Sequence, residues 1–172
     1  MVEKTRTMVR EPGPENNMYE IHIKARRDFI QRQNVGKLLI KANERNWEVS
    51  RQGRTKNFMY PNLWPENALQ DWVIFQQDIV THSGKHRHQG SLVIFVLDGR
   101  GYTVVDGVRQ DWKKGDLILL PLKQGGVEHQ HFNLEPGQPC KWIAMIYIPM
   151  YDQVASFTEQ IELSPLYTAG TK

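Results

Sequence analysis

The fold of this chain can be read from one stretch, HRHQGSLVIFVLDGRGYTVVDGVRQDWKKGDLILLPLKQGGVEHQHFN, residues 86–133. Short runs of Val, Ile, Leu, Tyr and Phe recur in it, and Asp-Gly turns at LDGRG (97–101) and VDGVRQ (105–110) separate them. β-Branched and aromatic residues favour strands, and Asp-Gly favours tight hairpin turns. The stretch therefore predicts an all-β sandwich or barrel built from short antiparallel strands.

The flanking sequence continues this pattern on both sides. DWVIFQQDIV (71–80) and CKWIAMIYIP (140–149) read as further strands. Before them we expect a short helix over 24–34, a strand over 36–42, a loop over 45–57 and an irregular segment over 57–69. Helical spacing returns over 152–163. The predicted organisation is a flexible arm (1–20), an extension packing on the barrel (21–70), the barrel (71–150) and a C-terminal tail or helix (151–172).

Composition excludes several classes of protein. The chain has 172 residues, enough for one domain with its own core. Its net charge of +3, from 22 Lys and Arg against 19 Asp and Glu, gives no concentrated basic face, so we expect no nucleic-acid binding. No apolar run approaches the roughly 20 residues of a membrane helix, so we expect no membrane span. A single cysteine, Cys140, and a polar N-terminus without a signal peptide predict a cytoplasmic protein.

Histidines form the main chemical signal. His86, Arg87 and His88 lead into the strand SLVIFVL, and His129 and His131 repeat the same spacing in VEHQHFN. Residues two apart in a strand share a face, so each pair projects to one side while Arg87 projects to the other. A closed sheet can bring three or four of these imidazoles within reach of one metal ion. We expect His22 to be structural or at the surface, and His82 to be a weaker candidate ligand in a Ser/Gly/Lys loop.

The stretch from Gly84 to Asn133, which contains both H-x-H pairs, resembles the two motifs of the cupin superfamily. His86, His88 and Gly99 match the first motif, and Gly115, Pro121, His129 and Asn133 match the second. The resemblance implies a double-stranded β-helix barrel of the jelly-roll type, with short flanking helices. It also implies that His86, His88 and His129 are the metal ligands.

A narrower resemblance, from Trp72 to Pro149, is to the gentisate 1,2-dioxygenase group, in a single-domain form. That likeness implies a mononuclear, non-haem Fe(II) centre that cleaves a hydroxylated aromatic ring with dioxygen. Imidazole ligands do not choose between metals, so Mn, Ni and Zn stay open. Other readings are a metal-dependent lyase, isomerase or decarboxylase, a non-catalytic small-molecule binder, or the companion subunit of a larger oxygenase.

Two departures from these patterns bear on the substrate. Leu92 and Val93 stand where the general motif has Glu, which agrees with a three-histidine site. Ile94 stands where the dioxygenase group carries an Arg that binds the substrate's carboxylate. A buried carboxylate needs a charged partner, and Arg87 faces away, so we expect a neutral diphenol unless Arg100 or Lys123 from a loop replaces that Arg. The longer spacing between Pro121 and His129 is expected to form a loop at 125–126.

The remaining candidates surround the expected metal. Metal-bound imidazoles need partners for their other ring nitrogens, and by resemblance Asn133 is the best of them. His131 and Gln89 are the candidate catalytic residues, His131 as a proton donor. One of Gln76 and Gln77 is expected to line the pocket, and Phe95, Trp142, Met145 and Tyr147 are either its walls or ordinary core. By analogy with the family we expect a homodimer or a subunit of a hetero-oligomer.

Overall fold

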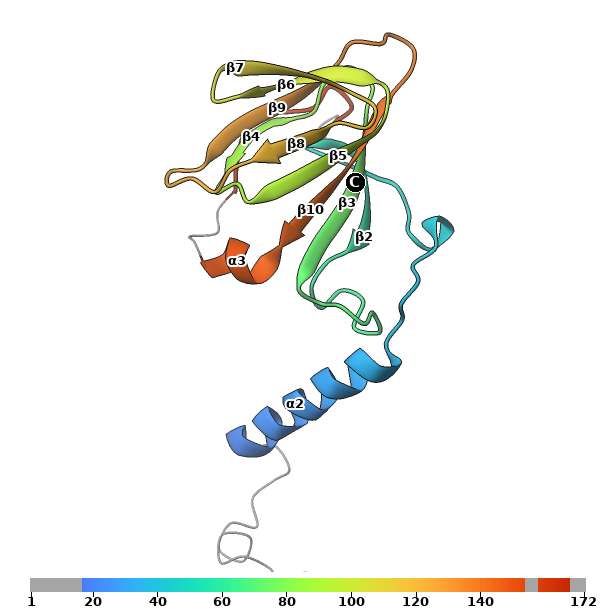
Figure 1. The fold of residues 1–172 in the computed structure, drawn as a ribbon, viewed down its shortest axis with the longest axis vertical. Coiled ribbons are helices and arrows are strands. Elements are labelled where there is room, and N and C mark those ends of the chain that lie inside the picture. The colour runs from blue at the N-terminus through green and yellow to red at the C-terminus, as the bar shows by residue number, and fades with distance from the viewer. Residues whose placement is uncertain (1–16, 154–157, 168–172) are drawn as a thin grey trace, which may run out of the picture. The chain divides into compact units, whose positions relative to one another are not determined.

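The structure is a computed structural model and describes residues 17–153 and 158–167. These residues form two α-helices, one short 3-10 helix and a series of strands (Figure 1). The elements are α2 (Met18–Val35), η1 (Ala42–Glu44), β1 (Glu48–Ser50), β2 (Gly53–Met59), β3 (Trp72–Ile79), β4 (Lys85–His88), β5 (Leu92–Asp98), β6 (Arg100–Val105), β7 (Val108–Lys113), β8 (Leu117–Leu120), β9 (Val127–Asn133), β10 (Cys140–Tyr147), α3 (Ile148–Gln153) and β11 (Thr158–Glu162). None of the described helices has the length and apolar character needed to cross a membrane.

The chain divides into two compact units, of which the first contains α2 and residues 66–69. Asn17 caps α2, since its side chain accepts a hydrogen bond from the Glu20 amide at 3.1 Å. The amide of Gly36 donates to the Arg32 carbonyl at the other end. The helix expected over 24–34 is therefore confirmed, and it is longer than expected. Residues 1–16, most of the expected arm, lie outside the described part of the chain.

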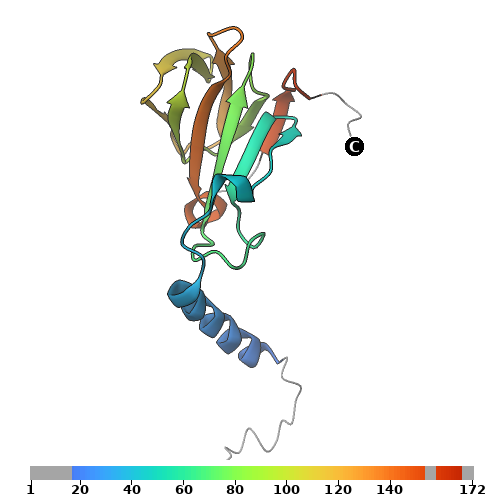
Figure 2. The ribbon, with the colours of Figure 1, turned by 90° about the vertical axis from the view of Figure 1, so that its right-hand side faces the viewer.

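The second unit is a jelly roll of two antiparallel sheets, which face one another in Figures 1 and 2. One sheet has the strand order β1-β2-β3-β10-β5-β8, and the other has the order β11-β4-β9-β6-β7. The expected all-β fold of the cupin type is confirmed. The barrel begins before residue 71, because β1 and β2 belong to the six-stranded sheet.

Alternation along the strands explains where the core lies. In β5, Leu92, Ile94 and Val96 are buried, whereas Val93 and Phe95 between them are each 37% exposed. In β10, the buried positions are Cys140, Trp142, Ala144 and Ile146. Successive side chains of a strand point to opposite faces, so each strand gives one face to the space between the sheets. The apolar core lies in that space.

The β6–β7 hairpin confirms the turn predicted at VDGVRQ. Val105 pairs with Val108 across the two-residue loop Asp106-Gly107, where φ is 47° and 83°. Two successive positive φ values define the turn type that follows the right-handed twist of paired strands, and Asp-Gly adopts it readily. The sequence pattern did not predict the second strand of this hairpin, β7, as a separate strand.

One expectation about the histidines was wrong in a way that matters for the site. His86 and His88 do not run into SLVIFVL as one strand; they lie on β4, in the opposite sheet from β5. The chain turns between the two strands at Gly90 and Ser91, where φ is 87° and 60°. A Cβ at Gly90 would lie 1.9 Å from the Pro121 carbonyl oxygen, so only glycine fits this corner.

Three other segments also differ from expectation. Residues 36–42 form no strand apart from an isolated bridge at Lys37, and Leu38 is 89% exposed. The expected loop at 45–57 contains β1 and most of β2, because β3 provides a pairing partner for turn-rich sequence. The expected helix at 152–163 is partly wrong: residues 152–153 end α3, 154–157 lie outside the description, and 158–162 form β11 paired with β4. Sheet partners distant in sequence override local propensity in these last two cases.

Candidate functional site

The site is built on the pairing of β4 with β9. His86 lies directly opposite His129 in this antiparallel ladder, and His88 lies opposite Val127. Because His86 and His88 share the inner face of β4, both rings turn toward His129. Arg87 projects from the other face, as expected, where it contacts Glu128 at 2.9 Å and Glu159 at 3.6 Å.

Three imidazoles meet on the inner face. The ring centroids of His86 and His129 are 4.2 Å apart, those of His88 and His129 are 4.8 Å apart, and those of His86 and His88 are 5.4 Å apart. One ring nitrogen from each residue lies within 4.8 Å of the others. Two nitrogens bound to one ion at about 2.1 Å can be no more than about 4.2 Å apart. The set is therefore close enough to bind an ion after a small side-chain adjustment.

The ring nitrogens have two kinds of hydrogen-bond partner. Nδ1 of His86 lies 3.4 Å from the Gly84 carbonyl, and Nδ1 of His129 lies 3.1 Å from the Val127 carbonyl. A ring that donates from Nδ1 keeps the lone pair of Nε2 for a metal. Nδ1 of His88 instead accepts from the Gly90 amide at 3.0 Å. The neutral ring of His88 then carries its proton on Nε2, and the lone pair of Nδ1 is engaged by the Gly90 amide. His88 is therefore the ligand whose ring must turn before a nitrogen lone pair can bind an ion.

Burial keeps all three imidazoles neutral. Desolvation, followed by the nearby His129, lowers the pKa of His86 to about 3. Desolvation and the neighbouring His86 lower the pKa of His88 to about 4, and desolvation and His88 lower the pKa of His129 to about 4. Neutral imidazole is the form that binds metal ions. The donor set thus fits a divalent metal ion at neutral pH, and it does not specify which one.

His131 adds a fourth imidazole next to the three. It is fully buried, its Nδ1 lies 2.7 Å from the Thr103 hydroxyl, and its ring centroid lies 5.5 Å from that of His129. The Trp112 indole donates to the same hydroxyl at 2.9 Å. Desolvation lowers the pKa of His131 well below its ordinary value. His131 is thus a neutral, positioned imidazole at the pocket wall.

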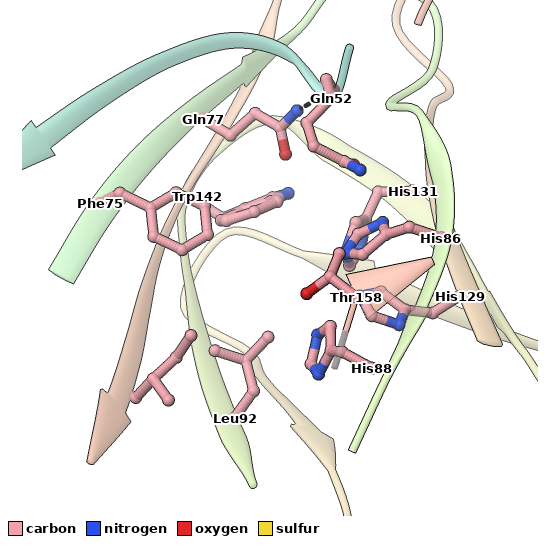
Figure 3. A pocket seen from close by; sticks show the side chains of 11 residues that line it. Gln52, Phe75, Gln77, His86, His88, Leu92, His129, His131, Trp142 and Thr158 are labelled. Atoms are coloured by element: carbon pink, nitrogen blue, oxygen red, sulfur yellow. Dashed lines mark hydrogen bonds between the residues drawn. The ribbon is translucent and has the colours of Figure 1, made fainter. Parts of the chain in front are cut away.

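A pocket of about 150 Å³ opens beside these histidines. Figure 3 shows the imidazoles on one side of it and the side chains of Phe75, Trp142 and Leu92 on the other. None of its described lining residues is Asp, Glu, Lys or Arg. A cavity of this volume can hold one benzene ring. The lining residues are Gln52, Phe75, Gln77, His86, His88, Leu92, His129, His131, Trp142, Ile146 and Thr158.

Several expected residues lie outside this lining. Gln89 is buried but does not line the pocket, so its catalytic role stays a prediction. Asn133 contacts no histidine through the hydrogen bonds of its amide: it donates to the carbonyls of Ile79, Val80, Glu135 and Gln138, and accepts from the Glu135 amide and the Cys140 thiol. Asn133 thus holds the turn after β9.

The weaker histidine candidates are also apart from the cluster. His82 interacts with the Ser83 carbonyl and the Gln130 amide, and His22 lies on α2 beside Arg26. Phe95, Met145 and Tyr147 do not line the pocket, since strand alternation sends them to the outer face. Arg100 contacts Glu135, and Lys123 contacts Asp106. The described lining includes neither cation.

Two lining residues were not singled out from the sequence. Gln52 lies in the turn between β1 and β2, inside the segment expected as a loop, and Thr158 begins β11, where a helix was expected. Neither carried a local signal, because each reaches the pocket only through pairing with a distant strand. Gln77 confirms the expectation that one of two adjacent glutamines lines the pocket. Both readings of Trp142 hold, because it lines the pocket and also belongs to the core cluster.

Comparison with known proteins agrees with this geometry. Residues 78–146 match the model of the cupin domain. A 74-residue segment is 35% identical to a gentisate 1,2-dioxygenase of Ralstonia sp, covering 42% of this chain and 20% of that protein. The chain therefore spans about a fifth of the length of this curated relative.

Solved structures show the same fold at low sequence identity. The nucleoside dehydratase Pac13 of Streptomyces is 9% identical with a TM-score of 0.54, covering 74% of this chain and 92% of that one. The polyketide cyclase RemF of Streptomyces resistomycificus is 16% identical with a TM-score of 0.54, covering 76% and 90%. Oxalate decarboxylase of B. subtilis is 13% identical with a TM-score of 0.56, covering 74% and 33%. These proteins differ in activity, so the fold by itself does not select a reaction.

Proposed function

We propose that the cupin domain of this chain holds one Fe(II) ion on His86, His88 and His129 and acts as a dioxygenase that opens a hydroxylated aromatic ring. The observation that carries this proposal is the cluster of three neutral imidazoles beside an apolar pocket of about 150 Å³. The similarity to a gentisate 1,2-dioxygenase over 74 residues supports the same reaction class. Bound iron would supply the redox chemistry that dioxygen needs to react with an aromatic ring.

The apolar walls would hold the ring against the histidines. Phe75 and Trp142 pack edge to face, with centroids 5.7 Å apart, and Leu92 and Ile146 complete the apolar lining. Such walls exclude water and bind a flat ring without fixing a charge. The lining therefore favours a neutral phenol over a carboxylated one, because the described lining residues provide no cation to a carboxylate.

His131 would orient the substrate in this reaction. Its neutral ring can form a hydrogen bond with a substrate hydroxyl, while Thr103 and Trp112 hold the ring in place. This role rests on position, since His131 lines the pocket next to His129.

The test starts from the protein purified without added metal. Its metal content is measured, and oxygen uptake is then followed with Fe(II) and a panel of hydroquinones, catechols and salicylates. We expect stoichiometric oxygen uptake with at least one neutral diphenol, and its loss in His86→Ala but not in His82→Ala.

Other outcomes would point to the other functions. Consumption of substrate without oxygen uptake would replace the dioxygenase with a metal-dependent lyase, isomerase or decarboxylase. Inactivity of the metal-loaded chain alone, together with co-purification of a larger cupin chain, would identify a companion subunit.

A further inference from the structure

Two buried polar atoms of the pocket lining have no hydrogen-bond partner among the described residues. They are the indole nitrogen of Trp142 and the side-chain oxygen of Gln52. Trp142 is only 2% exposed, so water outside the barrel does not satisfy its N–H. Buried polar groups in folded proteins are normally paired. An unpaired donor and an unpaired acceptor in one pocket therefore indicate a ligand that pairs them.

The orientation of the Gln52 amide is fixed by its neighbour. The side-chain nitrogen of Gln160 donates to the carbonyls of Lys85 and Glu162, at 3.2 and 2.7 Å. The oxygen of Gln160 must therefore be the acceptor that faces Gln52, and Gln52 donates to it through Nε2. That contact leaves Oε1 of Gln52 as an acceptor.

The two atoms have opposite and fixed hydrogen-bonding roles. An indole N–H can only donate, and a carboxamide oxygen can only accept. A hydroxyl suits both roles, because its oxygen can accept from an indole N–H and its hydrogen can be donated to a carboxamide oxygen. A carboxylate would meet the Gln52 oxygen with a second acceptor, and a methyl group would satisfy neither atom.

These atoms lie in the same pocket as the metal-binding histidines. Figure 3 shows the nitrogen end of Trp142 and the side chains of Gln52 and Gln77 at one end of the pocket, and Leu92 and His88 at the other. The volume of about 150 Å³ suits a single ring placed between them.

We propose that Trp142 and Gln52 form a recognition site for a second, neutral hydroxyl on the ring, distinct from the hydroxyl that faces His86, His88 and His129. This inference rests on the proposed function and deepens it, because it requires a ring that carries a second, neutral hydroxyl away from the three histidines. Trp142 and Gln52 are the specificity-determining residues, and they select by hydrogen bonding rather than by charge.

The first test compares ligands on the unaltered protein. Binding of hydroquinone, 4-methylphenol and 4-hydroxybenzoate is measured by calorimetry without oxygen, so that no turnover occurs. A methyl group and a hydroxyl have similar size, so the pair isolates the hydrogen bonds. Hydroquinone should bind about tenfold more tightly than 4-methylphenol, as expected for two modest hydrogen bonds. Equal affinity of these two ligands, or tightest binding of 4-hydroxybenzoate, would overturn the proposal.

The second test removes each protein atom in turn. Trp142→Phe deletes the N–H and keeps an aromatic wall, and Gln52→Met deletes the oxygen and keeps the side-chain length. Each variant should reduce the advantage of hydroquinone to about twofold or less while 4-methylphenol keeps its affinity. Thermal unfolding checks that each variant folds, and the ligand comparison on the unaltered protein decides the matter if one does not.

Two control variants separate recognition from packing. Phe75→Leu alters an apolar wall and should weaken both phenols equally, so their affinity ratio should persist. Trp72→Phe, at a tryptophan that packs on Tyr147 and does not line the pocket, should leave both affinities unchanged. A fall of the ratio in Phe75→Leu as large as in Trp142→Phe would reduce the effect to packing and contradict the proposal.

The ligand-binding tests and the oxygen-uptake test can succeed or fail separately. Hydroxyl discrimination without ring opening would support the recognition site and refute the dioxygenase. Ring opening without hydroxyl discrimination would support the dioxygenase and refute the recognition site.

Discussion

His86 and His129 lie directly opposite one another in the ladder of β4 and β9, with ring centroids 4.2 Å apart. Strand register therefore sets the separation of these two candidate ligands. A slip of one residue would send one of the two rings to the outer face. Glu128 acts against such a slip, because on that outer face it contacts Lys85 at 2.6 Å and Arg87 at 2.9 Å.

The first prediction concerns metal content. Replacing any one of His86, His88 and His129 with Ala should lower metal affinity at least about tenfold, since one of three ligands is lost. Elemental analysis after dialysis against a weak chelator measures the occupancy. His82→Ala and His22→Ala are the matched controls, because neither residue belongs to the cluster. Full occupancy in His86→Ala would remove that residue from the ligand set.

The pH dependence of metal binding should also be unusual. Protons compete with metal only when they bind the ligands, and the pKa values of His86, His88 and His129 are lowered to between about 3 and about 4. Metal affinity should thus stay nearly constant from pH 8 to about pH 5 and fall below that. Titration with a fluorescent competitor at each pH tests this. A steep loss already at about pH 6.5, the ordinary imidazole value, would show that the cluster is less buried than described.

Stability of the metal-free protein should fall in acid for the same reason. Each imidazole has a lower pKa in the folded than in the unfolded chain, so the unfolded chain binds more protons between about pH 3 and about pH 6.5. The free energy of unfolding should drop as pH falls through this window, by at most about 1.4 kcal/mol per pH unit for each histidine. Urea denaturation at several pH values measures the slope.

Matched variants identify the source of that slope. The double variant with His86→Leu and His129→Leu should make the slope shallower, because two of the titrating imidazoles are gone and His88 and His131 remain. His22→Leu should leave it unchanged, since His22 is exposed on α2. An unaltered slope in the double variant would assign the acid sensitivity to other groups.

Ile94 gives a prediction about the missing carboxylate-binding Arg. Ile94 has no exposed surface and belongs to the core cluster rather than to the pocket lining. Ile94→Arg should therefore destabilise the protein by several kcal/mol, because it buries an unpaired charge. It should not create a carboxylate site. Val108→Arg, at a position that is 58% exposed, should change stability by less than about 1 kcal/mol. A stable Ile94→Arg protein that binds 4-hydroxybenzoate would contradict this expectation.

We propose that the chain forms a homodimer. Val93 and Phe95 on β5, with Leu117 and Leu119 on the edge strand β8, place exposed apolar side chains on the outer face of the six-stranded sheet. Such a strip is typical of a surface that a partner covers. Light scattering at micromolar concentration should give a dimer mass, and Leu119→Glu should give the monomer. A monomer mass for the unaltered protein would refute the dimer.

The sequence by itself determined the fold class and the histidine cluster. The alternation of SLVIFVL and the two H-x-H pairs are local patterns of period two, and the Asp-Gly turn of VDGVRQ is a local steric preference, so none of them needs a distant partner to be recognised. The other Asp-Gly break, LDGRG, was wrongly expected as a hairpin turn, because β5 before it and β6 after it lie in different sheets. The alternation of side chains along a strand also correctly predicted that Arg87 points away from the site.

Only the tertiary structure decided which residues complete the pocket. Thr158 lies in a segment whose local sequence indicates a helix, and it becomes part of the barrel because β11 pairs with β4. Gln52 lies in a turn, as expected, and reaches the pocket because the next strand, β2, pairs with β3. Asn133 has the right spacing for a histidine partner, but its amide is engaged by carbonyls of the Ile79–Val80 and Glu135–Gln138 backbone. Hydrogen bonds between segments distant in sequence settle such choices, and a linear pattern carries no information about which distant partner is within reach.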